Sequence, residues 1–270
     1  MSVGVGLVAY CMSENDILRI SKSLDLSSLE YKVVVDNSPT NSSQSLFEEY
    51  NWLYIHKPDN PGFGASHNII FNRFSYLADY HSIINPDIFF TTDPFINLVN
   101  FLKENKDAGA VMPKVVYPSG KIQRLTKLLP TPIDVTIRRL PIKALQDLVN
   151  KRYEIHNADY FKGTYRVPFI SGCFIVFKTK ILKKIGFFDE RYFMYFEDTD
   201  LCRRLWINSY YPYYYSFVKV KHGYEKGSAK SLKLFGIHIK SAIKYFLKWG
   251  FFDSERKNIN KSCLKQFNNN

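Results

Sequence analysis

The chain has 270 residues, of which 46% are hydrophobic and 16% aromatic, and its formal net charge is +12. This composition supports a substantial core near the upper size of a single domain. No stretch approaches the roughly 20 apolar residues of a membrane-spanning helix, and the first residues lack the basic region of a secretory signal, so the sequence predicts a cytosolic protein. The four cysteines are widely scattered, which argues against a disulfide framework and a zinc site.

The positive charge is concentrated towards the C-terminus. Residues 219–270 contain 12 Lys and Arg against 3 Asp and Glu, a net of +9, which leaves +3 of the total for residues 1–218. A basic segment at one end predicts an anionic surface as its partner and makes a nucleic-acid-binding core a poor interpretation.

The first ninety residues predict alternating strands and helices. Apolar runs typical of buried strands alternate with segments of helical periodicity, which is the order of βαβ units, and we expect a mostly parallel sheet covered by helices. Ligands of such sheets bind at the carboxyl ends of the strands, where Asp36 and Asp87 are expected. The predicted strands are 3–10, 31–38, 52–58 and 80–90, and the predicted helices lie within 16–26, 42–50 and 60–77.

The second half is less regular. Residues 119–166 are basic and proline-rich at their start, and predict a loop with one or two surface helices. A buried strand at 169–177 then leads into a helix that ends at Gly186. We therefore expect one α/β domain at 1–228, with a nucleotide-binding half (1–118), a variable acceptor-side region (119–166) and a catalytic half (167–228), followed by a basic helix and tail at 229–270.

Three carboxylates follow predicted strands or turns: Asp36, Asp87 and Asp198. Each alone is typical of a turn residue that binds its own backbone. Together at one edge they can hold a ribose or base, a divalent cation and a proton acceptor. Asp198 belongs to a run of acids, with Glu197 and Asp200, that opens a helix, so stabilisation of the helix N-terminus and general-base catalysis both remain open.

Several common motifs of catalysis are absent from the sequence. The glycines of NPGFGASHN at 60–68 suit a close approach of the backbone to a phosphate or a sugar, but their spacing is not that of GxGxxG. The chain has no GxxxxGK[ST], GxSxG or HExxH motif. These observations argue against a dehydrogenase, a P-loop enzyme, an α/β-hydrolase and a zinc protease.

Six motifs, in order, resemble the inverting family 2 glycosyltransferases, especially the bacterial rhamnosyltransferases that build O-antigen and other surface polysaccharides. The motifs are VAYCMSEND, VVVDNSPTNSS, NPGFGASHNII, INPDIFF, the block from ISGCF to FEDTDLCRRL, and VKHGYEKGS. The similarity spans about residues 4–228, and the block at 171–204 is its most specific part. It implies a GT-A fold and a nucleotide-sugar donor.

The resemblance also implies a role for each matching residue. Asp198 would be the catalytic base, with Glu197 and Tyr195 on the acceptor side. Asp87 matches the last acid of the family's DXD motif, whose first position is Asn85 here, and His222 would be a further ligand of Mg²⁺ or Mn²⁺. Cys11 stands where the family often has Asn. The expected contacts of the nucleotide and its sugar are Ala9, Tyr10, Asp36, Asn37, Gly62, Phe63, Gly64, Asn68 and Asn85.

The segment 232–252 predicts a basic amphipathic helix. Lys240, Lys244 and Lys248 recur at helical spacing, with apolar residues on another side. Two arrangements remain open: ordinary packing against the domain, or contact with an anionic membrane surface. A polyprenyl-diphosphate-linked saccharide as the acceptor would give the membrane contact a purpose.

Two other classes of function remain as alternatives. A non-catalytic basic module that binds membrane or nucleic acid would make the three carboxylates dispensable. A sugar nucleotidyltransferase would need a glycine-rich basic loop after the first strand, where this chain has CMSEND. We expect a metal-dependent transferase that moves L-rhamnose from dTDP-L-rhamnose, or alternatively a hexose from UDP, to a lipid-linked saccharide. We expect it at the inner face of the cytoplasmic membrane, without nucleic acid as a partner.

Overall fold

The computed structural model describes residues 2–138, 140, 142–156, 158–160, 162–223 and 231–267. Residues 224–228 of the last predicted motif, residues 229 and 230 of the basic segment, and the final residues 268–270 lie outside the described residues. Strands and helices alternate through the first ninety residues, as their periodicity predicts.

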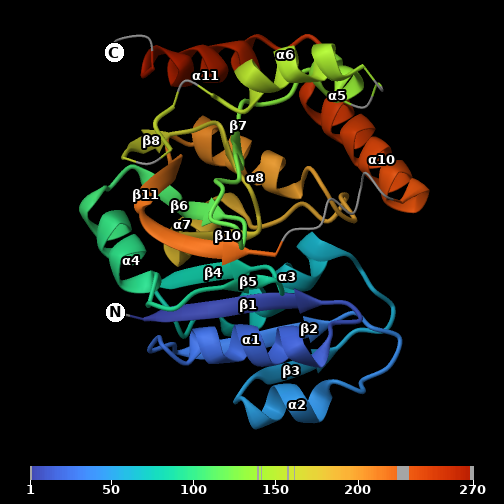
Figure 1. The fold of residues 1–270 in the computed structure, drawn as a ribbon, viewed down its shortest axis with the longest axis vertical. Coiled ribbons are helices and arrows are strands. Elements are labelled where there is room, and N and C mark those ends of the chain that lie inside the picture. Colours follow the sequence, from blue (N-terminus) through green and yellow to red (C-terminus); the bar gives the residue numbers. More distant parts are fainter. Residues whose placement is uncertain are drawn as a thin grey trace.

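The elements are labelled in Figure 1. The strands are β1 (Val3–Ala9), β2 (Tyr31–Asp36), β3 (Leu53–His56), β4 (Tyr80–Ile84), β5 (Ile88–Phe89), β6 (Ala108–Val116), β7 (Thr126–Lys127), β8 (Thr164–Arg166), β9 (Phe169–Ile170), β10 (Phe174–Lys178) and β11 (Tyr211–His222). The helices are α1 (Glu14–Leu24), α2 (Gln44–Glu49), α3 (Phe63–Phe74), α4 (Phe95–Glu104), α5 (Pro132–Ile137), α6 (Lys143–Tyr153), α7 (Thr179–Ile185), α8 (Glu197–Ile207), α10 (Leu232–Trp249) and α11 (Ser254–Lys265).

Most of the described strands form one mixed sheet in the order β3-β2-β1-β4-β10-β6-β11-β5. Strands β3, β2, β1 and β4 are parallel neighbours, as expected, and β6 is parallel to β11. Strand β10 runs antiparallel to both β4 and β6. The chain leaves β6 at Val116 and enters β10 at Phe174, which pairs with Ile84 at the end of β4. Strand β10 therefore begins at the edge where β4 and β6 end, and it runs through the sheet in the opposite direction.

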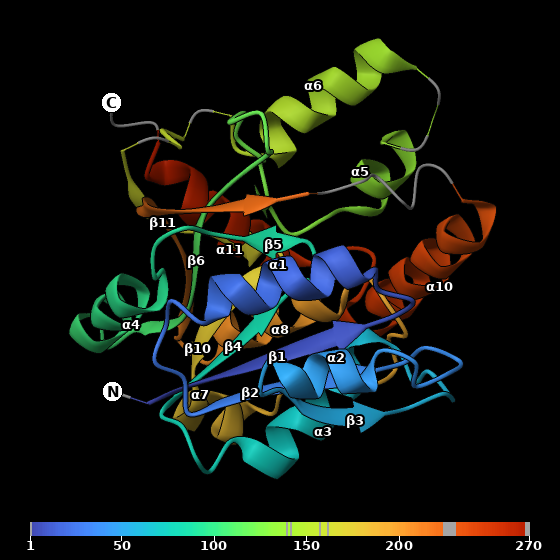
Figure 2. The ribbon, with the colours of Figure 1, turned by 60° about the horizontal axis from the view of Figure 1, so that its bottom comes forward.

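Strand β2 illustrates why both faces of the sheet are covered. Val34 lies in the apolar cluster that includes Ile17 of α1, whereas Val33 and Val35 lie in the cluster that includes Ile70 of α3. Successive side chains of a strand point to opposite faces. Helices α1 and α3 therefore cover opposite faces, as Figure 2 shows, and the carboxyl edge of the parallel strands is left available for ligands.

Helix α4 and strand β6 are two elements that the patterns above do not predict. Leu98, Val99 and Leu102 give α4 a buried side at helical spacing. Strand β6 is buried along nearly its whole length because it lies between β10 and β11. Strand β6 thus completes the half of the sheet that includes β11, at whose end His222 lies.

The two C-terminal helices contact the rest of the fold. Ser241 of α10 donates a hydrogen bond to the backbone oxygen of Met194 at 2.8 Å. In α11, a helix that the sequence did not predict, the Asn260 amide accepts from the backbone N–H of Leu129 at 2.8 Å and donates to its oxygen at 2.9 Å. One side of α10 thus packs against the domain. Among the helices of the described ranges, none is both long and apolar enough to cross a membrane.

Candidate active site

Polar residues from separate strands meet at one edge of the sheet. The carboxyl ends of β1 and β2 lie side by side, with Ala9 opposite Asp36. Strand β4 ends at Ile84, which pairs with Phe174 at the start of β10. Strand β11 reaches the same edge at His222, which pairs with β5. The sheet therefore gathers the strand-end candidates, as the rule for parallel sheets predicts.

Asp36 and Asn37 are buried at this edge and bind protein groups. Asp36 Oδ2 accepts a hydrogen bond from the Tyr54 hydroxyl at 2.7 Å, and Oδ1 accepts from the Ser38 backbone N–H at 2.9 Å. The Asn37 amide donates to the Ser66 hydroxyl at 2.9 Å. Both residues are less than 5% exposed. They fix the turn after β2, and their expected contact with the nucleotide stays a prediction.

The end of β1 offers a different environment. Ala9 is fully buried, whereas Tyr10 is 58% exposed. Cys11 has a left-handed backbone (φ 48°), and its N–H donates to the Ser38 hydroxyl at 2.7 Å. This contact holds the turn so that the Tyr10 ring stands out beside Asp36. An exposed aromatic face at a strand end suits stacking on a nucleobase.

The glycine-rich loop before α3 is clamped to the segment before the carboxylates. The Phe63 N–H donates to the Phe193 oxygen at 2.8 Å. Gly62 has φ +99°, and a Cβ there would lie 2.2 Å from the same oxygen. Only glycine satisfies both conditions. The sequence expects these glycines beside the nucleotide sugar, and the loop also has this second role of close contact with 187–197.

Gly64 and Asn68 extend the same contact. A Cβ on Gly64 would lie 3.0 Å from Phe188 Cβ and 3.6 Å from Glu197 Cβ. The Asn68 amide donates to the Phe188 oxygen at 2.9 Å and accepts from the Phe188 N–H at 3.0 Å. Asn68 therefore orients residues 187–190 through its side chain, and a contact with the donor sugar would be additional to this role.

Asp87 and His222 form the candidate cation site. His222 Nε2 lies 3.1 Å from Asp87 Oδ1, and His222 is 2% exposed. Its Nδ1 lies 2.8 Å from Gln123 Oε1, while Gln123 Nε2 donates to the His222 backbone oxygen at 2.9 Å. This arrangement puts the ring hydrogen on Nδ1 and turns the Nε2 lone pair towards the carboxylate and towards Asn85 Nδ2, 3.4 Å away.

The donor set of Asp87 and His222 fits a divalent cation. A carboxylate oxygen and an imidazole lone pair that face each other at 3.1 Å attract a cation or a proton between them, and metal-binding histidines usually hold their other nitrogen in a hydrogen bond. In the part of the chain that the structure describes, no three His, Cys, Asp or Glu side chains converge. Oxygens of a phosphorylated substrate would therefore complete the coordination.

Asp198 lies in the first turn of α8. Its Oδ2 accepts a hydrogen bond from the Gly172 N–H at 3.1 Å, and its Oδ1 accepts from the Thr199 N–H at 2.8 Å. The second contact satisfies one amide of the helix N-terminus. Oδ1 therefore stabilises the start of α8, which is one of the two roles that the sequence leaves open. Burial raises the pKa of the Asp198 carboxyl, while the two amides and nearby Lys127 act in the opposite direction.

Glu197 is enclosed beside Asp198. It is 5% exposed, and its Oε2 has no hydrogen-bond partner in the described part of the chain. Burial, followed by the charge of Asp198, raises the pKa of Glu197 well above its ordinary value. The preceding Tyr195 and Phe196 have left-handed backbones with φ 70° and 69°, a conformation that costs about 1–3 kcal/mol for each residue. The surrounding contacts must hold this turn.

The third acid of the run forms ion pairs inside the protein. Asp200 is fully buried, and its Oδ2 lies 2.9 Å from Arg204 Nε. Its Oδ1 lies 2.6 Å from Lys248 Nζ and 2.8 Å from Trp249 Nε1. Asp200 therefore links α8 to α10, while Asp198 is the acid that remains partly exposed at the edge of the sheet.

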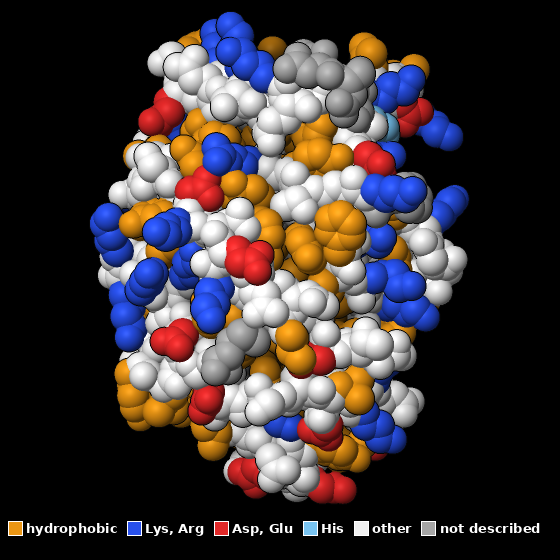
Figure 3. Space-filling view, turned by 90° about the vertical axis from the view of Figure 1, so that its left-hand side faces the viewer, with side chains coloured by type: hydrophobic (Ala, Val, Ile, Leu, Met, Phe, Trp, Pro, Cys, Tyr) orange, Lys and Arg blue, Asp and Glu red, His pale blue; other side chains and the backbone are white. Residues whose placement is uncertain are grey.

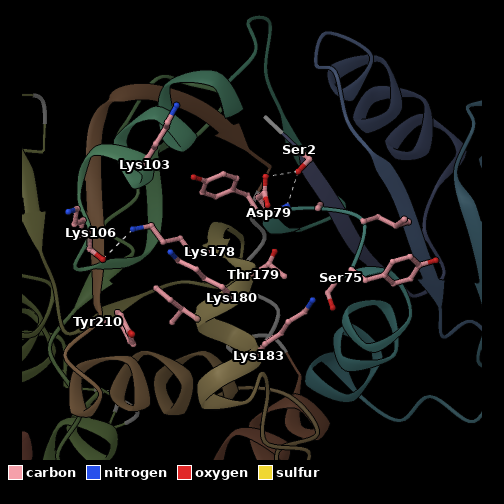
Figure 4. Close-up of a pocket in the computed structure, with 15 residues that line it drawn as sticks. Ser2, Ser75, Asp79, Lys103, Lys106, Lys178, Thr179, Lys180, Lys183 and Tyr210 are labelled. Atoms are coloured by element: carbon pink, nitrogen blue, oxygen red, sulfur yellow. Dashed lines mark hydrogen bonds between the residues drawn. The ribbon is translucent and has the colours of Figure 1, made fainter.

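A separate cavity of about 680 Å³ lies at the opposite edge of the sheet, near the starts of β1 and β4. Figure 4 shows the lysines that line it together with Ser2, Asp79 and Thr179. In Figure 3, which views the left-hand side of Figure 1, Lys and Arg side chains lie along both margins of the face. None of the candidate site residues lines this cavity. Its lysines are Lys103, Lys106, Lys178, Lys180 and Lys183.

Three contributors to the site carry no recognisable motif in the sequence. Gln123 orients His222, Gly172 binds Asp198, and the charge of Lys127 acts on Asp198. Gln123 and Lys127 lie in the basic segment 119–166, which was expected only to help choose the acceptor. Gly172 lies inside the resembling block, where its glycine character alone did not indicate a contact with the carboxylate.

The fold is that of the GT-A glycosyltransferases. The structure of GalNAc-T7 with UDP, GalNAc and Mn²⁺ is similar over 90% of this chain and 48% of that chain, with a TM-score of 0.64 and 12% identity. The mannosyltransferase PcManGT from Pyrobaculum calidifontis, in complex with GDP-Man and Mn²⁺, is similar over 96% of this chain and 68% of that chain, with a TM-score of 0.63 and 14% identity.

The family model described as glycosyl transferase family 2 matches residues 9–186, and the chain belongs to this family. It is a glycosyltransferase, as the ordered motifs indicate. The rhamnosyltransferase WbbL of Escherichia coli is 23% identical over 86% of this chain and 88% of its own length. The N-acetylglucosaminyl-diphospho-decaprenol L-rhamnosyltransferase of Mycobacterium tuberculosis is 24% identical over 67% of this chain and 63% of its own length.

Proposed function

We propose that this chain is a metal-dependent inverting glycosyltransferase that transfers L-rhamnose from dTDP-L-rhamnose to a polyprenyl-diphosphate-linked saccharide. The product would enter a bacterial surface polysaccharide such as O-antigen. Two relatives whose names specify rhamnosyl transfer support the donor, and the name of the mycobacterial relative supports a diphospholipid acceptor. A UDP-linked hexose is the alternative donor, because identities of 23–24% are compatible with a change of sugar.

One connection carries this proposal. The N–H of Gly172 binds Asp198 Oδ2 at 3.1 Å, and the oxygen of the next residue, Cys173, accepts the N–H of Asn85 at 2.8 Å. The candidate base is thus joined through two successive residues to the strand end that carries Asp87. A proton acceptor and a cation site held on one rigid connection suit transfer from a nucleoside diphosphate.

The reacting hydroxyl of the acceptor would give its proton to Asp198. As its oxygen bonds to the anomeric carbon of the donor sugar, the bond between that carbon and the diphosphate breaks. The base must be ionised to accept the proton. Asp198 favours the ionised form more than Glu197 does, because its oxygens accept two backbone N–H bonds whereas Glu197 Oε2 has none in the described ranges.

Asp87 and His222 would hold Mg²⁺ or Mn²⁺, which supplies positive charge to stabilise the leaving diphosphate. Gln123 keeps the His222 ring in the required orientation through its contacts with Nδ1 and the backbone oxygen. The solved relatives named above contain Mn²⁺ together with UDP or GDP-mannose. These observations support a divalent cofactor.

The outer side of α10 suits an anionic membrane surface. Leu232, Ile243 and Leu247 are exposed by 90%, 49% and 71%, and Phe252 directly after the helix is fully exposed. Exposed lysines flank these apolar residues on α10, namely Lys233, Lys240 and Lys244. Apolar residues that enter the headgroup region and lysines that contact anionic headgroups are typical of peripheral membrane helices. We therefore propose that the enzyme works at the inner face of the cytoplasmic membrane.

The test of the proposed function is thermal stability of the purified chain with a panel of nucleoside diphosphates and nucleotide sugars. It is run with Mn²⁺, with Mg²⁺ and with EDTA. At 100 times its dissociation constant, a ligand stabilises the fold by about 2.7 kcal/mol. We expect the largest shift with dTDP-L-rhamnose and a metal, and its loss in Asp87→Ala. A larger shift with a UDP-hexose would support the alternative donor, and no shift with any nucleotide would contradict the proposal.

A further inference from the structure

A cationic cavity adjoins the candidate base. It has a volume of about 620 Å³ and lies between the segment 117–156, the strained turn at Tyr195 and Phe196, and His238 of α10. Phe196 directly precedes the carboxylates, and Gln123 connects the cavity wall to His222. The cavity therefore lies on the acceptor side of the proposed reaction, and its size is typical of a ligand site.

The charges of this cavity are not balanced. Arg124, Lys127 and Arg138 line it together with one carboxylate, Glu154. Glu154 lies 3.3 Å from Arg138 Nη2 and 3.5 Å from His156 Nε2, so its charge is already engaged. Arg124 and Lys127 form no ion pair among the described residues, although the charges of Glu154 and Asp198 act on Lys127. These two cations define the anion-binding side of the cavity.

Arg124 and Lys127 are also only partly exposed to the solvent that usually stabilises such groups. Arg124 Nη1 is buried without a hydrogen-bond partner among the described residues, and its guanidinium carbon lies 4.7 Å from the centre of the Tyr160 ring. Lys127 Nζ lies 5.8 Å from the centre of the Phe169 ring, and burial lowers the pKa of this amine to about 8. A desolvated cation is unfavourable until an anion contacts it, so these groups favour a strongly charged ligand.

Building on the proposed function, we propose that Arg124 and Lys127 bind the diphosphate of the lipid-linked acceptor in this cavity. Lys127 is close enough to Asp198 for its charge to lower the pKa of that carboxyl. The anionic group of the acceptor then lies near the reacting hydroxyl. An acceptor with a short saccharide between the diphosphate and the hydroxyl would fit this arrangement.

The position of α10 indicates the direction in which the polyprenyl chain would leave the cavity. His238 of α10 lines the cavity, and the exposed apolar side of the same helix includes Leu232, Ile243 and Leu247. A polyprenyl chain attached to a diphosphate in the cavity would leave along α10 towards the membrane surface. The anion site and the membrane-facing helix are thus parts of one acceptor path.

The test measures binding of geranyl diphosphate, a soluble polyprenyl diphosphate without a sugar, to the full chain by calorimetry. The titration is run in EDTA and without a donor, so that the metal-dependent donor site does not contribute. We expect binding to wild-type protein, weakened about tenfold or more in Arg124→Gln and in Lys127→Gln, which is the effect of removing a charge-assisted hydrogen bond. Lys103→Gln, which removes a cation from the cavity of Figure 4, is the matched control and should bind like wild type.

A second readout separates this inference from the proposed function. The metal-dependent dissociation constant of the donor nucleotide should be unchanged in Arg124→Gln and Lys127→Gln. Absence of geranyl diphosphate binding in wild type, equal binding in all variants, or binding that needs metal and disappears in Asp87→Ala would overturn the acceptor site. Each of these results leaves the thermal response to nucleotide sugars intact, so the proposed function can hold while this inference fails.

Discussion

Lys248 of α10 holds its ammonium group 2.6 Å from Asp200 Oδ1 in α8, and this ion pair joins the C-terminal helix to the helix that carries the candidate base. The ring nitrogen of Trp249 donates to the same carboxylate oxygen at 2.8 Å. Asp200 is fully buried. Helix α10 therefore supports the helix that carries Asp198, and it also has an exposed apolar side.

Replacement of Asp200 by alanine should destabilise the fold strongly. The substitution leaves Lys248 and Arg204 without their shared carboxylate, and loss of one partner from a buried ion pair typically costs about 3–5 kcal/mol. Urea denaturation measures the change in the free energy of unfolding. Lys240→Ala, on an exposed position of α10, is the control and should change it by about 0.5 kcal/mol or less. Equal effects of the two substitutions would show that the link does not stabilise the fold.

Gly62 allows a direct comparison of strain and collision. Gly62→Ala places a Cβ 2.2 Å from the Phe193 oxygen at φ +99°, whereas Gly120→Ala meets nothing within 4 Å at φ +85°. We expect Gly120→Ala to cost about 1–2 kcal/mol from the left-handed backbone alone, and Gly62→Ala to cost clearly more. Thermal and urea denaturation of both variants give the difference. Similar losses would mean that the contact between the loop and Phe193 is easily displaced.

Glu197→Gln should change the pH dependence of stability and leave that of activity nearly unchanged. The pKa of Glu197 is raised in the folded chain, so its contribution to stability is present below its ordinary value of 4.5 and is lost as the pH rises. Glutamine cannot ionise, so the fall in the free energy of unfolding between pH 5 and 8 should become smaller. The acid limb of the kcat profile should stay close to that of wild type, because Glu197 is still protonated and uncharged while Asp198 ionises.

The control for this prediction is Glu104→Gln, an exposed change of the same type at the end of α4. Its unfolding free energy and its kcat profile should follow those of wild type across the same pH range. If the unfolding free energy of Glu197→Gln has the same pH dependence as that of wild type, the enclosed carboxyl does not titrate in the way its environment indicates.

Two buried histidines should make the fold sensitive to acid. Burial lowers the pKa of His81 to about 3 and that of His67 well below its ordinary 6.5, so both rings are neutral in the fold. Below pH 6.5 the unfolded chain binds protons that the folded chain does not, and stability falls as the pH decreases towards 3. His81→Gln should reduce this slope by up to about 1.4 kcal/mol per pH unit.

The slope is measured by urea denaturation between pH 7 and 5. His156→Gln is the control, because the side chain of His156 is exposed and its loss should leave the slope near that of wild type. A slope in His81→Gln as steep as in wild type would exclude His81 as a source of the acid sensitivity.

The strands and helices of the first ninety residues are well predicted from the sequence, because they follow local patterns. Val33, Val34 and Val35 of β2 are continuously apolar since the strand is covered on both faces, which periodicity alone can indicate. The position of β10 between β4 and β6 depends on where a long excursion returns, and no local pattern records that. The GT-A expectation therefore came from the ordered motifs rather than from the strand order.

The site residues likewise divide into those that the sequence predicts and those that it does not. Asp36 and His222 end strands and Asp87 follows the end of β4, so their places at one edge could be predicted because strand ends meet there. Gln123 and Lys127 could not, since they reach the site from a segment whose path is set by tertiary contacts. The resemblance already distinguishes Asp198 from Asp200, and the position of α10 adds a physical difference, since Lys248 pairs with Asp200.

The central claim is that Asp198 is the catalytic base, and the most direct measurement is the kcat of Asp198→Asn with the donor identified by the binding panel. We predict a fall of about 10²- to 10⁴-fold with an unchanged dissociation constant for the donor nucleotide. The melting temperature should fall only slightly, through loss of the Gly172 contact. Asparagine keeps the size of the side chain and one oxygen that can accept from the Thr199 N–H. A kcat within a few fold of wild type would contradict the account and return Asp198 to a structural role at the start of α8.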